Sequence, residues 1–401
     1  MPKRKRQPFV GVDLGGTSLR AGVVSAEGEV LALERFRLGH DHGASQDHSR
    51  IIRLSYHDAD HTALTPHTYT AWGEVEAESG VRLVHKTGGL DIAPAGCDAA
   101  DRYGAAMRAA GIPYEELDAA EAMRRFPQWR LDGDERVLYQ ADSGLVDARK
   151  ANAAHVALAR RHGATVLEET PVHRLRPVPN GDGVDAVTDA GVFRAGTVVV
   201  CADAWTNQVL AGVGVCWTLT ITGEQVTLWA TPHLREFAPD RFPIFIWHGE
   251  DYYGFPVYGE VATKAGLDVG GDVVTLDTRT YEANPRPFAK LVAFLEEHIP
   301  GSLGPVLYTK SCLYTMPPDR NFVIDRLPGN PRIVVAQGAA HAFKFSCLIG
   351  KITAQLATAG QTTYPIDAFI LNRPALTDPA FRPEFHLVRE EFAAMYERQA
   401  V

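Results

Sequence analysis

The sequence is poor in cysteine, has no long apolar run and carries no excess of positive charge. Its five cysteines are scattered over 401 residues and never form a C-x-x-C pair, so neither a disulfide framework nor a zinc site is indicated. No segment approaches the length of a membrane span. The net charge of −9 argues against a nucleic-acid partner or an acidic membrane surface. These absences predict a protein of the reducing cytoplasm.

Strand-like and helical stretches alternate along the chain, which predicts an α/β fold. Helices are expected at 65–79, 98–110, 119–125, 147–163 and 346–358, the first with Thr65 as N-cap and Pro66 at its first position. Strands are expected within 9–35 and at 88–92, 164–167, 197–201 and 333–336. Between about 215 and 315 the pattern changes to short strands rich in aromatic residues, typical of an antiparallel sheet. We therefore expect one nucleotide-type domain with this sheet inserted.

Four segments carry residues suited to chemistry. They are Arg50–Tyr56, Tyr252–Pro256 followed by Lys264, Lys310–Thr315 leading into Asp319–Asp325, and His341–Ser346. In this order and spacing they resemble the monomeric sarcosine oxidase and N-methyltryptophan oxidase family, flavoenzymes of the D-amino-acid-oxidase-like class. The resemblance runs from about Glu29 to Leu387 and includes the landmarks Asp142-Ser143-Gly144 and Asn372-Arg373-Pro374-Ala375-Leu376. Each motif alone is weak, whereas the ordered set is specific.

The resemblance implies a covalent FAD. Cys312 would carry the flavin through a thioether, although a free cysteine of this kind is more often a small buried hydrophobe. Lys310, two residues away, could help to hold the thiolate. Further cofactor contacts are implied at Ser45, Val172 and Phe343.

The resemblance also implies how substrate and oxygen are held. Arg53 and Lys344 would grip the substrate carboxylate, the arginine as a planar fork and the lysine as a point charge; a surface salt bridge is the alternative for Arg53. Lys264 would stabilise the negative charge that develops on oxygen. Arg50 and His341 would lie beside the flavin ring.

Other residues of the expected cavity have less specific signals. Tyr56, Tyr253 and Tyr314 would line it, but core packing explains a tyrosine with a satisfied hydroxyl equally well. Asp268 stands where sarcosine-type members have a histidine, and an acidic group there would favour a cationic or hydrogen-bond-donating part of the substrate. A histidine-rich stretch, 40–61, lacks any recognisable ligand spacing, so no metal is expected.

The N-terminus departs from the family. Gly11 and Gly16 keep two glycines of the dinucleotide loop and Glu34, 23 residues after Gly11, stands where the acidic ribose ligand belongs, but the middle glycine is Asp13. Read alone, residues 9–33 resemble the phosphate-binding hairpin of the sugar-kinase and repressor family. An ATP-dependent sugar kinase and a relative with impaired flavin binding therefore remain alternatives. The other motifs of a kinase are absent from the sequence.

The sequence as a whole predicts an FAD-dependent oxidase of secondary or N-methylated amino acids that reduces oxygen to hydrogen peroxide. Its expected partners are a small amine substrate and oxygen, without nucleic acid or membrane, and it is expected to be a monomer. Residues 1–84, 143–214 and 320–385 would form the FAD-binding, Rossmann-like domain. Residues 85–142 and 215–319 would form the substrate domain, and 386–401 a C-terminal tail helix.

Overall fold

A six-stranded, mostly parallel sheet forms one half of the molecule in the computed structural model, which describes residues 9–13, 29–179, 181 and 183–383. Its strand order is β20-β21-β13-β1-β2-β9. The strands are β1 (Phe9–Asp13), β2 (Val30–Glu34), β9 (Thr165–Leu167), β13 (Thr197–Cys201), β20 (Val323–Leu327) and β21 (Asn330–Gln337). Only the β20–β21 pair within this sheet is antiparallel.

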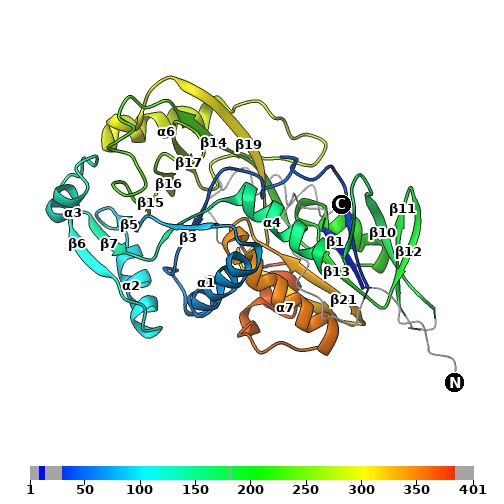
Figure 1. Cartoon of the computed structure of the whole chain (residues 1–401). Coiled ribbons are helices and arrows are strands. Elements are labelled where there is room, and N and C mark those ends of the chain that lie inside the picture. Colours follow the sequence, from blue (N-terminus) through cyan, green and yellow to red (C-terminus); the bar gives the residue numbers. More distant parts are fainter. Residues whose placement is uncertain (1–8, 14–28, 180, 182, 384–401) are drawn as a thin grey trace.

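Both faces of this sheet are covered, which explains its continuous β-branched runs. On one face, β13 and β21 pack with helices α1 (Ala59–Ser79), α4 (Ala148–Arg161) and α7 (Ser346–Ala359) into one apolar cluster. On the other face they pack against the meander β10–β12 (Val172–Pro177, Val184–Thr188, Gly191–Ala195) and α5 (Thr206–Leu210). Figure 1 shows α1 and α7 side by side below the sheet, and the meander beyond β13.

The N-terminal strand has no free edge. Along its whole length β1 pairs in parallel with β13 on one side and with β2 on the other. In a phosphate-binding hairpin, the strand after the turn pairs antiparallel with the strand before it. The described sheet leaves such a strand no place beside β1, so the kinase-like interpretation of residues 9–33 is not supported. Gly16 and the rest of residues 14–28 lie outside the described residues.

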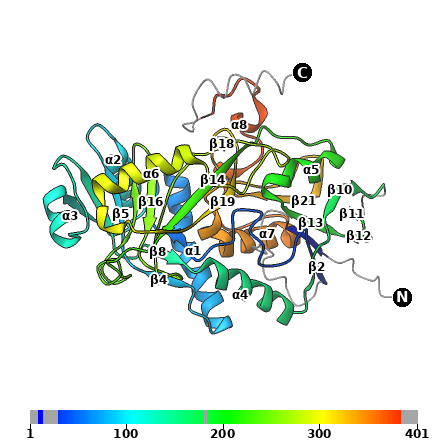
Figure 2. The same cartoon turned by 90° about the horizontal axis from the view of Figure 1, so that it is seen from above.

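The second large sheet is built mainly from the aromatic segment, as predicted. Its order is β18-β14-β17-β16-β15-β5-β7-β6, with β19 paired to β14. The long antiparallel pair β14 (Thr220–Trp229) and β19 (Val306–Met316) runs through the middle of the molecule in Figure 2. The other strands are β5 (Gly89–Ala93), β6 (Glu115–Asp118), β7 (Arg136–Gln140), β15 (Ile244–Trp247), β16 (Tyr252–Phe255), β17 (Thr263–Leu267) and β18 (Asp272–Val273). Pairing is antiparallel except between β5 and β15.

Most predicted helices are confirmed, among them α2 (Ala99–Ala109) and α3 (Ala119–Arg125). The start of α1 was predicted wrongly: it begins at Ala59, because Asp58 caps it by accepting a hydrogen bond from the His61 amide. Pro66 is therefore inside the helix and lacks the donor for the Thr62 carbonyl, which instead accepts from the Thr65 hydroxyl at 2.9 Å.

Helix α6 (Pro285–His298) was not predicted, although it has the sequence signs of a start: Asn284 caps it and a proline occupies its first position. A further, short sheet has the order β3-β8-β4 (Arg50–Ile52, Gly144–Val146, Val84–Lys86). The short helix α8 (Pro374–Thr377) follows near the end of the described residues. The predicted tail helix 386–401 lies outside the described residues. Within those residues, no helix is both long and apolar enough to cross a membrane.

Candidate active site

A cavity of about 530 Å³ lies between the two large sheets. The parallel sheet contributes segments that follow the carboxyl ends of β2, β13 and β21, where open α/β sheets bind their ligands. The antiparallel sheet contributes side chains of β14, β16, β17 and β19. The lining includes most of the predicted site residues: Ser45, Arg50, Arg53, Tyr56, Tyr253, Lys264, Asp268, Cys312, Tyr314, His341, Phe343 and Lys344.

Lys264 is held by a carboxylate that sequence reasoning missed. Its Nζ lies 2.7 Å from Asp47 Oδ2 and donates to the Ser49 carbonyl at 2.8 Å. The same carboxylate oxygen lies 2.5 Å from Nη1 of Arg50. Burial lowers the pKa of Lys264 to about 8, while Asp47 acts in the opposite direction. For Asp47 itself, burial alone would raise the pKa, but Lys264 and Arg50 outweigh it and hold the pKa well below its ordinary value.

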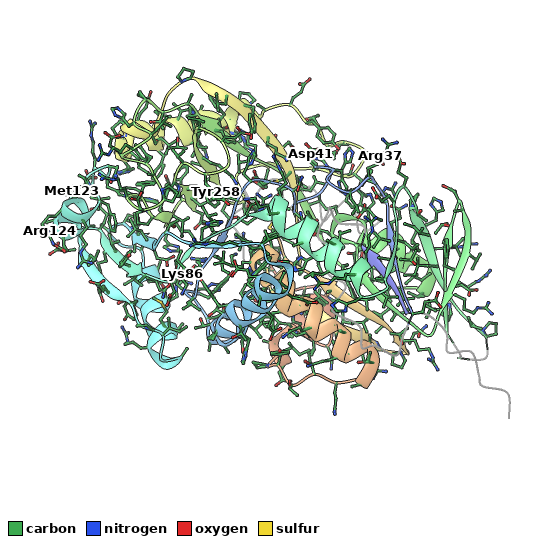
Figure 3. All side chains as sticks on the ribbon, in the orientation of Figure 1. Arg37, Asp41, Lys86, Met123, Arg124 and Tyr258 are labelled. Carbon is green, nitrogen blue, oxygen red and sulfur yellow. The ribbon has the colours of Figure 1, made fainter. Side chains whose placement is uncertain are left out.

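Cys312 lies on β19 directly opposite Glu224 of β14 and is buried. Burial raises the pKa of its thiol to about 11, and the nearby Arg50 acts against this rise. The expectation that Lys310 would support a thiolate is not met by the geometry, because Lys310 Nζ points to Asp41 Oδ2, 3.9 Å away. Asp41 is labelled in Figure 3. Alternation along β19 places Lys310 and Cys312 on the same face, yet only the tertiary structure shows that Arg50 and Lys264 are the cations that act on the thiol.

Arg53 forms a buried ion pair rather than a surface salt bridge. Its Nη1 donates to Asp91 Oδ1 at 2.7 Å, and the two side chains are 11% and 7% exposed. Asp91 also accepts from the Ser55 hydroxyl and lies 2.9 Å from His248 Nε2. Burial would raise the pKa of Asp91, but Arg53 and His248 lower it below the ordinary value. Asp91 on β5 is a further functional residue that the sequence alone did not identify.

Lys344 is buried beside Arg53 on the turn Phe343–Phe345 that precedes α7. Its Nζ donates to the Tyr56 hydroxyl at 3.0 Å and to the His341 carbonyl at 2.9 Å. Burial, reinforced by Arg53, lowers the pKa of Lys344 well below its ordinary value. Tyr56 therefore has both of the roles considered from the sequence: its ring packs in the core, and its hydroxyl accepts a hydrogen bond from a lysine of the cavity.

Asp268 does not offer a free negative charge to the cavity, which corrects the sequence-based expectation. Both of its carboxylate oxygens accept from Arg320 Nη2, at 2.8 and 2.7 Å. Arg320 follows Asp319, which is itself paired with Arg373 at 2.6 Å. Arg373 belongs to the Asn372–Leu376 motif near the C-terminus. Through its ion pair with Asp319, this motif fixes the loop that carries Arg320. The pair presents little net charge to a ligand.

His341 is a neutral ring in the cavity wall. Its Nε2 donates to the Arg320 carbonyl at 3.0 Å. Burial, with contributions from His61 and Arg320, lowers its pKa well below the ordinary value. The preceding Ala339 and Ala340 have φ of 47° and 71°, in the left-handed region that favours glycine. Ala339 and Ala340 therefore form a strained turn, and Ala340 lines the cavity.

Glu34 and Val172 lie near the end of β2, outside the cavity lining. The Glu34 carboxylate accepts from the Phe36 amide at 2.8 Å and lies 3.3 Å from His40 Nε2. Burial raises its pKa to about 8. The Glu34 carbonyl accepts from the Thr170 amide, which brings the start of β10, with Val172, next to this strand end. Gly11 lies within β1 beside it.

The residues present fit a flavin. Three buried nitrogens of the lining have no hydrogen-bond partner among the described residues: Nε of Arg53, Nε of Arg320 and Nδ1 of His341. A bound group that carries hydrogen-bond acceptors, as the flavin ring and the substrate carboxylate do, would supply partners for these nitrogens. By contrast, the described residues contain no group of three or more side chains suited to a metal. Among the histidines of the 40–61 stretch, His40 lies beside Glu34, whereas His57 and His61 share Asp58.

Comparisons with known proteins agree with this architecture. A family model described as FAD dependent oxidoreductase matches residues 18–356. A monomeric sarcosine oxidase of Streptomyces avermitilis is 35% identical over 89% of this chain and 95% of its own length. An N-methyl-L-tryptophan oxidase of Escherichia coli is 28% identical over 91% of this chain and 96% of its own. The resemblance predicted from the motifs is confirmed.

Solved structures share the fold. NikD, described as an unusual amino acid oxidase essential for nikkomycin biosynthesis, superposes with a TM-score of 0.78 at 28% identity, covering 90% of this chain and 97% of its own. A glycine oxidase of Geobacillus kaustophilus reaches the same TM-score at 19% identity, over 91% of this chain and 98% of its own. The predicted α/β fold with its inserted antiparallel sheet is confirmed.

Proposed function

The chain belongs to the FAD dependent oxidoreductase family, together with the monomeric sarcosine oxidases, and from this premise we propose that it oxidises secondary or N-methylated amino acids. The observation that carries the proposal is the meeting of two buried basic side chains, Arg53 and Lys344, in a cavity that Lys264 and Cys312 also line. A substrate carboxylate between the two would bind the guanidinium of Arg53 and would favour the charged form of Lys344, whose pKa is lowered without it.

FAD, when bound, would supply the redox chemistry, in which two electrons and two protons pass from the amine carbon–nitrogen unit to oxygen. Glu34 would accept a hydrogen bond from the ribose, and Ser45, Val172 and Phe343 would contact the cofactor. Arg50 and His341 would lie beside its ring. Cys312 would retain it covalently, which the family membership alone does not establish.

The chain's own groups would orient the substrate. Arg53 is locked by Asp91, and Lys344 is locked by Tyr56 and the His341 carbonyl, so both donors keep their direction without substrate. Preorganised donors of this kind reduce the entropy lost on binding. Tyr253 and Tyr314 would bound the space left for the substrate side chain.

Burial in the cavity would favour the reactive form of the amine. His341 is neutral, and the two arginines of the lining, Arg53 and Arg320, are each paired with a carboxylate. Loss of hydration disfavours a charged ammonium group, so burial would lower the pKa of the bound amine and release its proton to water. The neutral amine can then be oxidised, while the ammonium form cannot.

Lys264 would act on oxygen. A fixed ammonium in a buried site stabilises negative charge as it develops on a small acceptor. The product imine would hydrolyse in water, and the reduced oxygen would leave as hydrogen peroxide.

Acid precipitation tests the covalent cofactor. Yellow colour should remain in the pellet of the purified protein and move to the supernatant in Cys312→Ala. Cys216→Ala removes an exposed thiol and serves as the matched control, with its colour unchanged. The oxidase assignment is tested separately by peroxide release on a panel of N-methyl and cyclic amino acids. A colourless protein that phosphorylates a sugar with ATP would overturn it.

Three broader assignments belong to the same proposal. Residues 1–84, 143–214 and 320–385 are taken as the FAD-binding domain, and 85–142 and 215–319 as the substrate domain. Support comes from the sheets to which these segments contribute strands. We assign the protein to the cytoplasm, in line with its five free thiols. We take it to act as a monomer, like the relatives that are named monomeric sarcosine oxidase.

A further inference from the structure

Asp47 lines the cavity but has no role in the reaction as proposed above. It lies in the loop between β2 and β3 and is 2% exposed. Its Oδ2 is shared by two cations from different elements, Lys264 on β17 at 2.7 Å and Arg50 on β3 at 2.5 Å. A buried carboxylate placed between two cavity cations has to affect the charge of at least one of them.

We propose that Asp47 is a positioning residue that keeps the Lys264 ammonium charged and fixed in the cavity wall. The inference rests on the role of Lys264 toward oxygen proposed above and explains how so deeply buried a lysine can perform it. A positive charge can stabilise reduced oxygen only while the lysine holds its proton, and Asp47 supplies the interaction that holds it.

Burial and a neighbouring cation favour loss of that proton from Lys264. The side chain is 4% exposed, so its charged form has lost most of its hydration. Arg50 adds a like charge nearby. The Ser49 carbonyl and the face of the Phe255 ring, 4.3 Å away, orient the ammonium but carry no net negative charge. Other ionisable groups acting on Lys264 and its partners include Cys312, His48 and Lys310.

The consequence of removing Asp47 follows from the chemistry of its two partners. Asp47, Lys264 and Arg50 together carry one net positive charge. Without the carboxylate, two cations would lie close together in a buried space, and their repulsion would be relieved by deprotonation of one of them. Arginine cannot lose its proton in a protein, whereas a buried lysine can. Lys264 would therefore become neutral, and Arg50 would remain the charged member.

Direct titration of Lys264 tests the inference on the complete flavoprotein. The protein is labelled with 15N at lysine Nζ, and the Lys264 signal is identified by its loss in Lys264→Met. Lys264 in the unmodified protein should be charged at pH 7, with a midpoint near 8. Asp47→Asn should lower that midpoint by at least about one pH unit. Asp47→Glu should restore most of the difference, because it returns the carboxylate.

Asp268→Asn is the matched control. It also removes a cavity carboxylate paired with an arginine, here a half-buried one, but Asp268 contacts Arg320 and not Lys264. The Lys264 midpoint should stay unchanged in this variant. Equal midpoints in the unmodified protein and Asp47→Asn would overturn the inference. So would a neutral Lys264 at pH 7 in the unmodified protein, a result that needs no folded variant.

The oxygen reaction supplies a second readout. As the pH is raised, the rate constant for reoxidation of the substrate-reduced protein should begin to decrease at a lower pH in Asp47→Asn than in the unmodified protein. Lys264→Met should remove this pH dependence. If Lys264→Met reacts with oxygen as fast as the unmodified protein, the proposed role of Lys264 fails, while the titration still decides the effect of Asp47. The two failures are therefore distinguishable.

Discussion

Arg53 and Asp91 form a buried ion pair in which Arg53 Nη1 donates to Asp91 Oδ1 over 2.7 Å. The pair joins the segment after β3 to β5 of the antiparallel sheet. Asp91 is in turn held by Ser55 and His248. The residue proposed to recognise the substrate is therefore itself held by the antiparallel sheet, which lies across the cavity.

Replacement of Asp91 by asparagine should destabilise the protein by about 3–5 kcal/mol, because it leaves the Arg53 charge buried without its partner. Urea denaturation at pH 7 measures the loss. Asp142→Asn removes the partner of Lys86 in an exposed pair and should change stability little; Lys86 is labelled in Figure 3. Equal effects of the two substitutions would show that the Arg53–Asp91 pair contributes no more than a surface pair.

Lys344→Met should weaken recognition of the substrate carboxylate. A hydrogen bond to a charged group contributes about 1.5–3 kcal/mol, so kcat/KM for an N-methyl amino acid should fall roughly 10- to 150-fold. The methyl ester of the same amino acid lacks the charge and should lose much less. Steady-state peroxide assays with both compounds provide the test, and similar losses for acid and ester would argue that Lys344 has only a structural role.

Arg320→Met should change the preference for the substrate side chain. In the unmodified protein Asp268 is compensated by Arg320, so a cationic side chain should have no advantage over an apolar one of similar length. Without Arg320 the carboxylate is unpaired, and the kcat/KM ratio of cationic to apolar substrates should rise at least about tenfold. An unchanged ratio would place the substrate side chain away from Asp268.

Stability of the flavin-free protein should depend on Glu34. Burial raises the pKa of Glu34 from 4.5 to about 8. A carboxyl whose pKa is raised on folding contributes stability below its unfolded pKa, and that contribution is lost as the pH rises toward the folded value. Stability should therefore fall between pH 4.5 and about 8, and Glu34→Gln should reduce this slope. Urea denaturation across the range, with and without FAD, measures it; a variant as pH-dependent as the parent would contradict the burial of this carboxyl.

Local patterns sufficed where the cause of a structure is local. Helix α3 was predicted at its observed bounds, because its cap and helix formers lie within a few residues of one another. Helix α1 was predicted to start at residue 65, because Thr65-Pro66 has the pattern of a cap followed by a first helical position. The helix starts at Ala59, after the Asp58 cap. The interaction that tolerates Pro66 inside the helix, a threonine hydroxyl on the Thr62 carbonyl, becomes visible only in three dimensions.

By itself the sequence determined the family, the α/β fold with its antiparallel insertion, and a set of residues that line the cavity, because ordered motifs and apolar periodicity are written along the chain. Only the tertiary structure decided the electrostatic partners: Asp47 for Lys264, Asp91 for Arg53, Arg320 for Asp268 and Arg50 for Cys312. All four pairs are separated by 38 residues or more along the chain. Charge interactions act through space, and a buried group's state depends on the nearest opposite charge, which no local pattern specifies.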